Sequence, residues 1–194
     1  AKVSQLLANL GPEAVRLQAI TFERLVIGQI METQGSTKGM TPLEHYLAVI
    51  ADKTGSLIAA SARYGGMISG ADSKVTDSLT NFGESMGAVF QLADDIIDIA
   101  SDSKESGKTP GTDLREGVPT LVTIHAMESK DKSDEELKKL LSAPIKEEET
   151  VQQVIKTLRT HKAMDQSREV IQKYAADSRK HLSNLPAGKA KDAL

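Results

Sequence analysis

Cysteine and tryptophan are absent from this chain of 194 residues, and phenylalanine and tyrosine occur only three times each. Without cysteine, the sequence has no disulfide framework, no catalytic thiolate and no cysteine metal site. The scarcity of aromatic side chains argues against the stacking platforms that bind single-stranded nucleic acid. The formal net charge of −3 gives no electrostatic reason to expect nucleic acid or an anionic membrane as a partner.

Long apolar runs are also lacking, since none approaches the ~20 residues of a membrane-spanning helix. The first residues show no signal-peptide pattern, so we expect a cytoplasmic protein without a transmembrane segment. Alanine, leucine, lysine and glutamate are frequent and β-branched runs are rare, which favours an all-α fold. The length suffices for a sizeable core, and no internal repeat is visible. We therefore expect one all-helical domain over residues 1–194, with a frayed tail over residues 185–194.

The most informative stretch is a helix predicted over residues 72–100. Its apolar residues form two neighbouring stripes at helical spacing that cover about half of the helical wheel, so the helix is expected to be largely buried. The first stripe contains Leu79, Phe82, Met86, Phe90, Ala93 and Ile97, and the second contains Val89, Leu92, Ile96 and Ile99. The remaining arc carries Gln91, Asp94, Asp95 and Asp98.

Three carboxylates within a turn and a half of a buried helix repel one another and are costly to bury without a partner. Oxygen ligands without histidine or cysteine point to Mg²⁺ or Ca²⁺. Mg²⁺ usually binds through one or two carboxylates together with substrate phosphates. A basic partner follows in the loop Gly107-Lys108-Thr109-Pro110-Gly111. The simpler alternative is a solvated helix end whose aspartates cap the next helix.

The pattern around these aspartates is specific. It reads Phe90-Gln91-x-x-Asp94-Asp95-x-x-Asp98, followed by Gly107-Lys108-x-x-Gly111-x-Asp113-Leu114-x-Glu116-Gly117. It resembles the second aspartate-rich region of the trans-isoprenyl diphosphate synthases. That resemblance implies an all-α, antiparallel helical bundle of the isoprenoid synthase type. Members of the family join an allylic diphosphate to isopentenyl diphosphate, with Mg²⁺ held between two DDxxD motifs.

Two earlier helices extend the resemblance. The first, over residues 13–34, contains Gly28-Gln29-Ile30-Met31-Glu32, which is similar to the family's GQxx(D/E) segment. The second, over residues 42–64, begins at the capping signal Thr41-Pro42-Leu43-Glu44. It contains Tyr46-x-x-x-Ile50-x-x-Lys53-Thr54-x-x-Leu57, which resembles the family's YxxxIxxKTxxL helix. Without the resemblance, Gln29 would be a surface glutamine and Lys53 a lysine that extends to solvent.

Apolar residues also recur at helical spacing in the helix over residues 13–34. They are Val15, Ala19, Phe22, Val26 and Ile30. The rest of the chain predicts helices over residues 118–127, with Pro119 in the first turn, and over residues 133–141, 147–160 and 164–182. We interpret His125 as a satisfied core or surface histidine. His161 and Lys162 are expected to lie at a solvated helix end.

The resemblance implies a set of site residues. Mg²⁺, with Mn²⁺ as a substitute, would be held by Asp94, Asp95 and Asp98. The diphosphate would be bound by Lys53, Thr54, Gln91 and Lys108, and the catalytic set would be Asp94, Asp95, Lys53 and Lys108. For the intact protein, the implied function is a prenyltransferase that makes a longer all-trans polyprenyl diphosphate by ionisation, condensation and elimination. Family members are commonly homodimers.

The match covers only the later part of the family's usual length, and the chain contains one DDxxD motif. The first motif would lie upstream, so we expect the 194-residue chain alone to be inactive. The alternative is a non-catalytic helical subunit or scaffold with a vestigial diphosphate site. Val118 stands where many members have lysine in an EGKxT segment, which puts one phosphate contact in doubt. A Ca²⁺-binding helical protein is disfavoured because the EF-hand loop pattern is absent.

A nucleotide-binding alternative fails on the residues themselves. Gly107-Lys108-Thr109 has the end of a Walker A loop, but Asp102 occupies the position of its first glycine and no strand precedes it.

Overall fold

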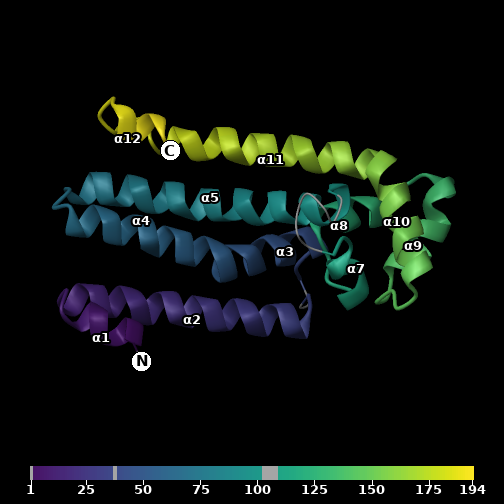
Figure 1. Ribbon diagram of the computed structural model, residues 1–194, viewed down its shortest axis with the longest axis horizontal. Helices are drawn as coiled ribbons and strands as arrows, with labels where there is room; N and C mark the ends of the chain where they lie inside the picture. Colours follow the sequence, from purple (N-terminus) through teal and green to yellow (C-terminus); the bar gives the residue numbers. More distant parts are fainter. Residues whose placement is uncertain (1, 37–38, 102–108) are drawn as a thin grey trace. The chain divides into compact units, whose positions relative to one another are not determined.

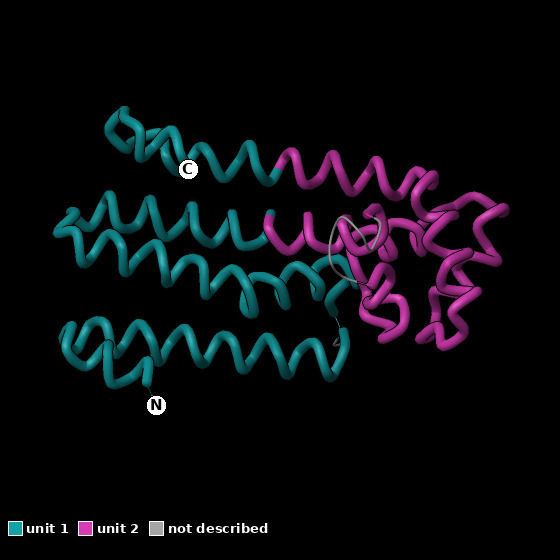
Figure 2. The backbone as a smooth tube through the Cα atoms, viewed as in Figure 1, with its two compact units in different colours: residues 1–89, 174–194 teal, residues 90–173 magenta. Residues whose placement is uncertain are grey.

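The computed structural model describes residues 2–36, 39–101 and 109–194. Across these ranges all regular structure is helical and no strand occurs, which confirms the all-α prediction. The chain divides into two compact units (Figure 2), unit 1 with Ala1–Val89 and Tyr174–Leu194, and unit 2 with Phe90–Lys173. The boundaries fall inside two helices, α5 (Ser73–Ala100) and α11 (Lys162–Lys180). The expectation of a single domain stays a prediction.

Unit 1 contains α1 (Lys2–Ala8), α2 (Pro12–Gln34), α3 (Pro42–Ile50), the π-helical turn η1 (Ala51–Gly55), α4 (Ser56–Ile68) and the first part of α5. In this unit, α2, the continuous run of α3, η1 and α4, and the first part of α5 run antiparallel to one another (Figure 1). The end of α11 and the one-turn helix α12 (Lys189–Asp192) complete the unit. The sequence predicted one helix over residues 42–64 and gave no sign of η1. The tail from residue 185 was expected to fray, and that stays a prediction.

Glycines bring η1 close to the helices on either side. A Cβ atom at Gly28 of α2 would lie 2.9 Å from Asp52 Cβ, and one at Gly87 of α5 would lie 2.5 Å from Gly55 Cα. Both separations are shorter than carbon atoms tolerate, so only glycine permits this packing. The π-helical turn is therefore held between α2 and α5.

The start of α3 follows its sequence signal closely. Thr41 Oγ1 accepts a hydrogen bond from the Glu44 amide at 3.2 Å, and the Thr41 amide donates to Glu44 Oε2 at 2.8 Å. These two bonds form a capping box. The hydrogen bonds to Thr41 lower the pKa of the Glu44 carboxyl. The predicted capping signal is confirmed.

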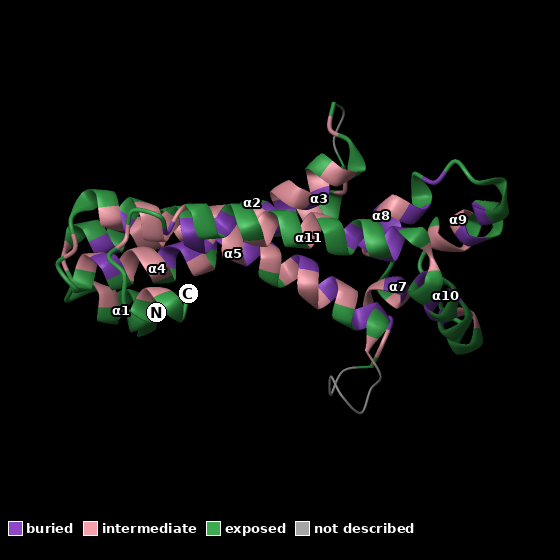
Figure 3. Cartoon of the chain, turned by 90° about the horizontal axis from the view of Figure 1, so that it is seen from above, coloured by how far each residue is buried: buried purple, intermediate pink, exposed green. Residues whose placement is uncertain are grey.

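The apolar residues that recur at helical spacing in α2 do not form its buried face. Phe22 is 63% exposed, and Val15, Val26 and Ile30 are also exposed. The buried and partly buried residues of α2 recur on another face, and they are Ala14, Leu17, Gln18, Thr21, Arg24, Leu25, Gly28, Met31 and Glu32. Figure 3 colours each helix by this burial. Small and charged residues lie on this face, where η1 approaches at Gly28.

Unit 2 contains a compact apolar core. The unit comprises the end of α5, α7 (Thr112–Glu116), α8 (Leu121–Met127), η2 (Lys132–Asp134), α9 (Glu135–Leu141), α10 (Glu148–Thr160) and most of α11. The core side chains include Ile99, Leu114, Val122, Leu137, Ile145, Val151, Val154, Ile155, Leu158 and Met164. Helix α8 begins after Thr120, whose side chain accepts a hydrogen bond from the Thr123 amide. Pro119 therefore precedes the helix instead of lying in its first turn.

The burial predicted for α5 needs a correction. Phe90 is 60% exposed and Ile97 is 44% exposed, although both belong to the first predicted stripe. Leu92 and Ile99 of the second stripe are buried as expected. One apolar side of the helix is thus left uncovered in unit 2. None of the described helices combines the length and apolar character that crossing a membrane requires.

Candidate functional site

The predicted metal ligands lie on the last two turns of α5, in unit 2. Asp95 is only 4% exposed, Asp98 is also buried, and Asp94 is partly buried. Gln91, one turn before Asp95, donates from Nε2 to Asp95 Oδ1 at 3.1 Å. The structure thus brings together the four residues predicted on this arc of the helix.

Asp98 also takes part in the local backbone structure. Its carboxylate accepts hydrogen bonds from the Thr112 and Asp113 amides at 3.3 and 3.4 Å, which caps the start of α7. Gly111 permits the sharp entry, because its φ of 78° is in the left-handed region. The capping alternative is therefore correct for Asp98, although the Asp98 side chain is buried. A capping role does not exclude a ligand role, because a carboxylate has about four acceptor sites.

The Asp113 carboxyl lies among like charges. Desolvation by burial, followed by repulsion from Asp95, Asp98, Glu116 and Asp94, raises its pKa to about 7. Such crowding is the electrostatic condition that a bound cation relieves. In the described parts of the chain, however, no three acidic or histidine side chains converge to the spacing of a metal site. The donor chemistry fits a hard cation, while a complete coordination sphere is not formed by these residues alone.

Lys53 and Thr54 belong to unit 1, where they lie in the π-helical turn η1. Lys53 Nζ pairs with Glu32 Oε2 at 2.6 Å, and Gln29 Nε2 donates to the same oxygen at 3.0 Å. Gln29 and Glu32 come from the segment that resembles GQxx(D/E), so this segment contacts the predicted diphosphate-binding lysine. Lys108, the remaining predicted ligand, lies outside the described residues.

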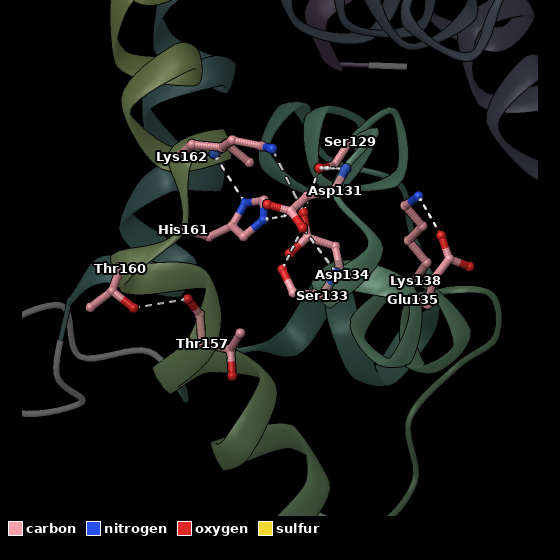
Figure 4. A network of polar contacts seen from close by, with 11 residues as sticks. Ser129, Asp131, Ser133, Asp134, Glu135, Lys138, Thr157, Thr160, His161 and Lys162 are labelled. Carbon is pink, nitrogen blue, oxygen red and sulfur yellow. Dashed lines mark hydrogen bonds and ion pairs between the residues drawn. The ribbon is translucent and has the colours of Figure 1, made fainter.

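A second polar cluster in unit 2 joins a serine, an aspartate and a histidine (Figure 4). Ser129 Oγ donates to Asp134 Oδ2, and His161 Nε2 lies 3.1 Å from the same oxygen. In catalytic triads the histidine lies between the serine and the acid, whereas here Asp134 lies between the other two. The Ala163 amide donates to His161 Nδ1 at 3.1 Å, so His161 caps α11. The cluster is therefore a structural clamp.

This clamp corrects the expectation for His161, whose side chain is 10% exposed and does not lie at a solvated helix end. The bonds from Ser129 and His161 lower the pKa of Asp134. The interpretation of His125 is supported, because its Nδ1 lies 3.1 Å from Ser167 Oγ.

Comparisons with known proteins agree with this fold and pattern. The family model described as Polyprenyl synthetase matches residues 1–158. The chain is 44% identical over 194 residues to "Nonaprenyl diphosphate synthase" of Mycobacterium tuberculosis, covering all of this chain and 58% of that protein. It is 35% identical over the same length to "Dimethylallyltranstransferase" of that organism, again covering 58%.

A solved structure extends the likeness to three dimensions. Geranylgeranyl pyrophosphate synthase from Corynebacterium glutamicum, complexed with calcium and isoprenyl diphosphate, matches with a TM-score of 0.87 and 39% identity over 98% of this chain and 59% of that one. The fold is thus that of the isoprenyl diphosphate synthases. The chain belongs to the polyprenyl synthetase family, and it spans less than two thirds of the length of these relatives.

Sequence reasoning missed three residues that the structure places beside predicted ones. Glu32 pairs with Lys53, Asp113 lies among the aspartates, and Arg24 contacts the turn that carries Lys53. Glu32 and Asp113 lie inside the family-like motifs, so their positions in those motifs could have identified them as site residues. Arg24 had no signal, since its partners are far away in sequence.

Proposed function

We propose that this chain is the diphosphate-binding part of a trans-prenyl diphosphate synthase, which condenses an allylic diphosphate with isopentenyl diphosphate. The observation that carries the proposal is the crowding of carboxylates at the end of α5, which together with the larger effect of desolvation by burial raises the pKa of Asp113 to about 7. The substrate is itself a polyanion, so binding it at an acidic helix end requires bridging cations. Asp94, Asp95 and Asp98 would hold Mg²⁺, or Mn²⁺ in its place. A bound divalent cation supplies Lewis-acid stabilisation of the leaving diphosphate.

The basic residues act on the same leaving group in this proposal. Lys53 and Lys108 would contact diphosphate oxygens, with Thr54 and Gln91 as further hydrogen-bonding partners. Their charges stabilise the negative charge that develops as the allylic C–O bond ionises. The allylic cation then alkylates isopentenyl diphosphate, and a proton is lost. No residue of this chain acts as a nucleophile.

Exposed apolar side chains on α5 support a binding surface for the hydrocarbon chain of the substrate. Phe90 and Ile97 lie on α5 beside the aspartates and remain largely uncovered. Apolar walls exclude water from a cation intermediate, and we assign that role to these two side chains. A cytoplasmic location fits water-soluble diphosphate substrates.

The oligomeric part of the proposal is a homodimer. Helix α2 exposes Val15, Phe22, Val26 and Ile30 on one side, and a continuous exposed apolar surface favours burial against a partner. Sedimentation equilibrium tests this assignment. Phe22→Glu is expected to shift the protein toward the monomer, whereas an unchanged mass would contradict it.

Titration of the 194-residue chain with inorganic pyrophosphate, with and without Mg²⁺, tests the diphosphate site by calorimetry. We expect weak binding that depends on Mg²⁺ and is lost in Asp94→Ala. Binding that is absent, or that does not depend on Mg²⁺, would favour the alternative that the chain is a non-catalytic subunit. The incomplete metal site of the described residues is also consistent with that alternative. We further expect no turnover by this chain alone, and steady formation of a longer prenyl diphosphate would refute that.

A further inference from the structure

A charged network around Arg24 in unit 1 has no role in the site described so far. Arg24 Nε donates to Asp52 Oδ1 at 2.7 Å, and its two terminal nitrogens donate to the Glu84 carboxylate at 3.0 and 2.5 Å. Nη2 also donates to the Ala51 carbonyl at 3.1 Å. A single guanidinium therefore links α2, η1 and α5, and the hydrogen bond to Glu84 raises its pKa above the ordinary value.

The turn that Arg24 contacts has an unusual backbone. The Ser56 amide donates to the Ala51 carbonyl, which is one residue further back than in an α-helix. Ser56 Oγ donates to the Asp52 carbonyl at 2.5 Å. π-Helical turns are rare and occur mostly as single turns at functional sites. They persist where surrounding contacts favour them over the α-helical alternative, and Arg24 supplies such a contact at the Ala51 carbonyl.

The geometry of α2 relates this contact to Lys53. Arg24, Gly28 and Glu32 are spaced four residues apart, so they lie along one side of the helix. Arg24 binds the start of η1, and Gly28 lets the backbone of η1 approach. Glu32 pairs with the ammonium group of Lys53 at 2.6 Å. One side of α2 thus contacts both the backbone of the turn and its functional side chain.

We propose that Arg24 is a positioning residue that holds η1 in its π-helical form and thereby sets where Lys53 presents its ammonium group. The part of this proposal that concerns ligand binding rests on the proposed diphosphate role of Lys53. The planar guanidinium is suited to the task because it donates to two carboxylates and a carbonyl at once, which a lysine ammonium cannot do in the same geometry. Glu84 and Asp52 fix the guanidinium in turn.

Hydrogen exchange of the 194-residue chain tests the backbone part. In Arg24→Gln, the amides of residues 52–56 should exchange at least about tenfold faster, because losing charge-assisted bonds to the turn lowers its opening free energy. The matched control is Arg63→Gln, which removes an arginine paired with Asp77 at 2.9 Å in the same unit. This control should leave exchange in residues 52–56 unchanged. Equal protection of the turn in Arg24→Gln and the native chain would overturn the proposal.

Binding of inorganic pyrophosphate in the presence of Mg²⁺ tests the link to Lys53. We expect Arg24→Gln to weaken binding about five- to tenfold and Arg24→Lys to be intermediate. The double variant Arg24→Gln/Lys53→Gln should bind no more weakly than Lys53→Gln alone, because Arg24 acts through Lys53. A general loss of stability would not produce this non-additivity. Independent, multiplicative losses would overturn the positioning role.

The two proposals fail in different ways. If Lys53→Gln binds pyrophosphate as well as the native chain, the proposed role of Lys53 is wrong, and the exchange measurement alone decides whether Arg24 holds the turn. If Lys53→Gln binds weakly while Arg24→Gln changes neither exchange nor affinity, the diphosphate role stands and the positioning role is wrong. Should Arg24→Gln not fold, Glu84→Gln replaces it, since that variant keeps Arg24 and its bonds to Asp52 and Ala51 and weakens only the two bonds to residue 84.

Discussion

Carboxylates in unit 1 lie beside arginine and lysine, whereas those at the end of α5 in unit 2 lie beside one another. Arg24 bonds both Asp52 and Glu84, and Lys53 bonds Glu32. In unit 2, desolvation by burial and then repulsion from four neighbouring carboxylates raise the pKa of Asp113. The first arrangement stabilises the local fold without a ligand. The second crowds like charges together, which is the electrostatic condition that the proposed cation would relieve.

The largest expected effect comes from removing one of the crowded carboxylates of unit 2. In a protein extended upstream to the length of its relatives, Asp94→Ala should lower prenyl transfer by about a hundredfold or more, because one stabiliser of the leaving diphosphate is lost. Product formation from an allylic diphosphate and isopentenyl diphosphate measures it. The matched control is Asp165→Ala, whose carboxylate is 79% exposed on α11. Similar losses in both variants would refute the site assignment.

A second change disturbs the packing that holds η1 in unit 1. Gly87→Ala should destabilise the protein by about 2–3 kcal/mol, because the new methyl group meets the Gly55 backbone and overpacks the contact. Urea unfolding measures the difference. Gly65→Ala is the control, since the space around its Cβ position is open, and we expect a gain of about 0.5–1 kcal/mol from the better helix former. A neutral Gly87→Ala would show that α5 and η1 are not tightly packed.

A third experiment adds Mg²⁺ and compares how variants in the two units change the stability that the cation confers. Mg²⁺ at about ten times its Kd should raise the free energy of unfolding by about 1.4 kcal/mol, since only the folded chain presents the aspartates together. Thermal unfolding with and without Mg²⁺ measures the gain. Asp94→Asn should reduce it, whereas Arg63→Gln in unit 1 should leave it intact. An equal gain in all three proteins would mean that the cation acts elsewhere.

The smallest effect concerns the clamp in unit 2. The pKa of Asp134 is lowered in the folded state from its ordinary 3.8, so the folded chain binds fewer protons and the clamp's contribution is present above that value. It is lost as the pH falls through the lowered pKa. Asp134→Asn should therefore make acid unfolding below about pH 4 less steep. Circular dichroism against pH measures this, and a change as large in the exposed control Asp165→Asn would contradict it.

The parts of the fold that depend on neighbouring residues were predictable from the sequence. The capping box of Thr41 and Glu44 needs only a three-residue spacing, and it forms as predicted. The long helix α5 and its row of aspartates follow from a strong helical period. The short helix α7 was missed because its five residues are set by left-handed glycines at Gly111 and Gly117.

The parts that depend on distant residues were not predictable. The apolar spacing of α2 does not identify its packed side, because that side uses Gly28 and Arg24 to meet a turn that lies more than twenty residues further along the chain. The π-helical turn itself has no local signal. The repulsion at Asp113 arises because α7 lies beside the end of α5. The motif spacing is compatible with this arrangement, but only the folded structure specifies it.

The π-helical turn also has a consequence for the length of the chain. A π-helical turn contains one residue more than the α-helical turn it replaces, so η1 is equivalent to a one-residue insertion in the helix formed by α3 and α4. Each residue of an α-helix rotates the chain by about 100°. Deleting one residue from Ala51–Gly55 would therefore restore a regular helix, but it would turn Ala59 and Ala60 away from the side they now bury. Homologous chains that keep this packing must keep the extra residue, whatever its identity, so a gap in this segment marks a different helix register.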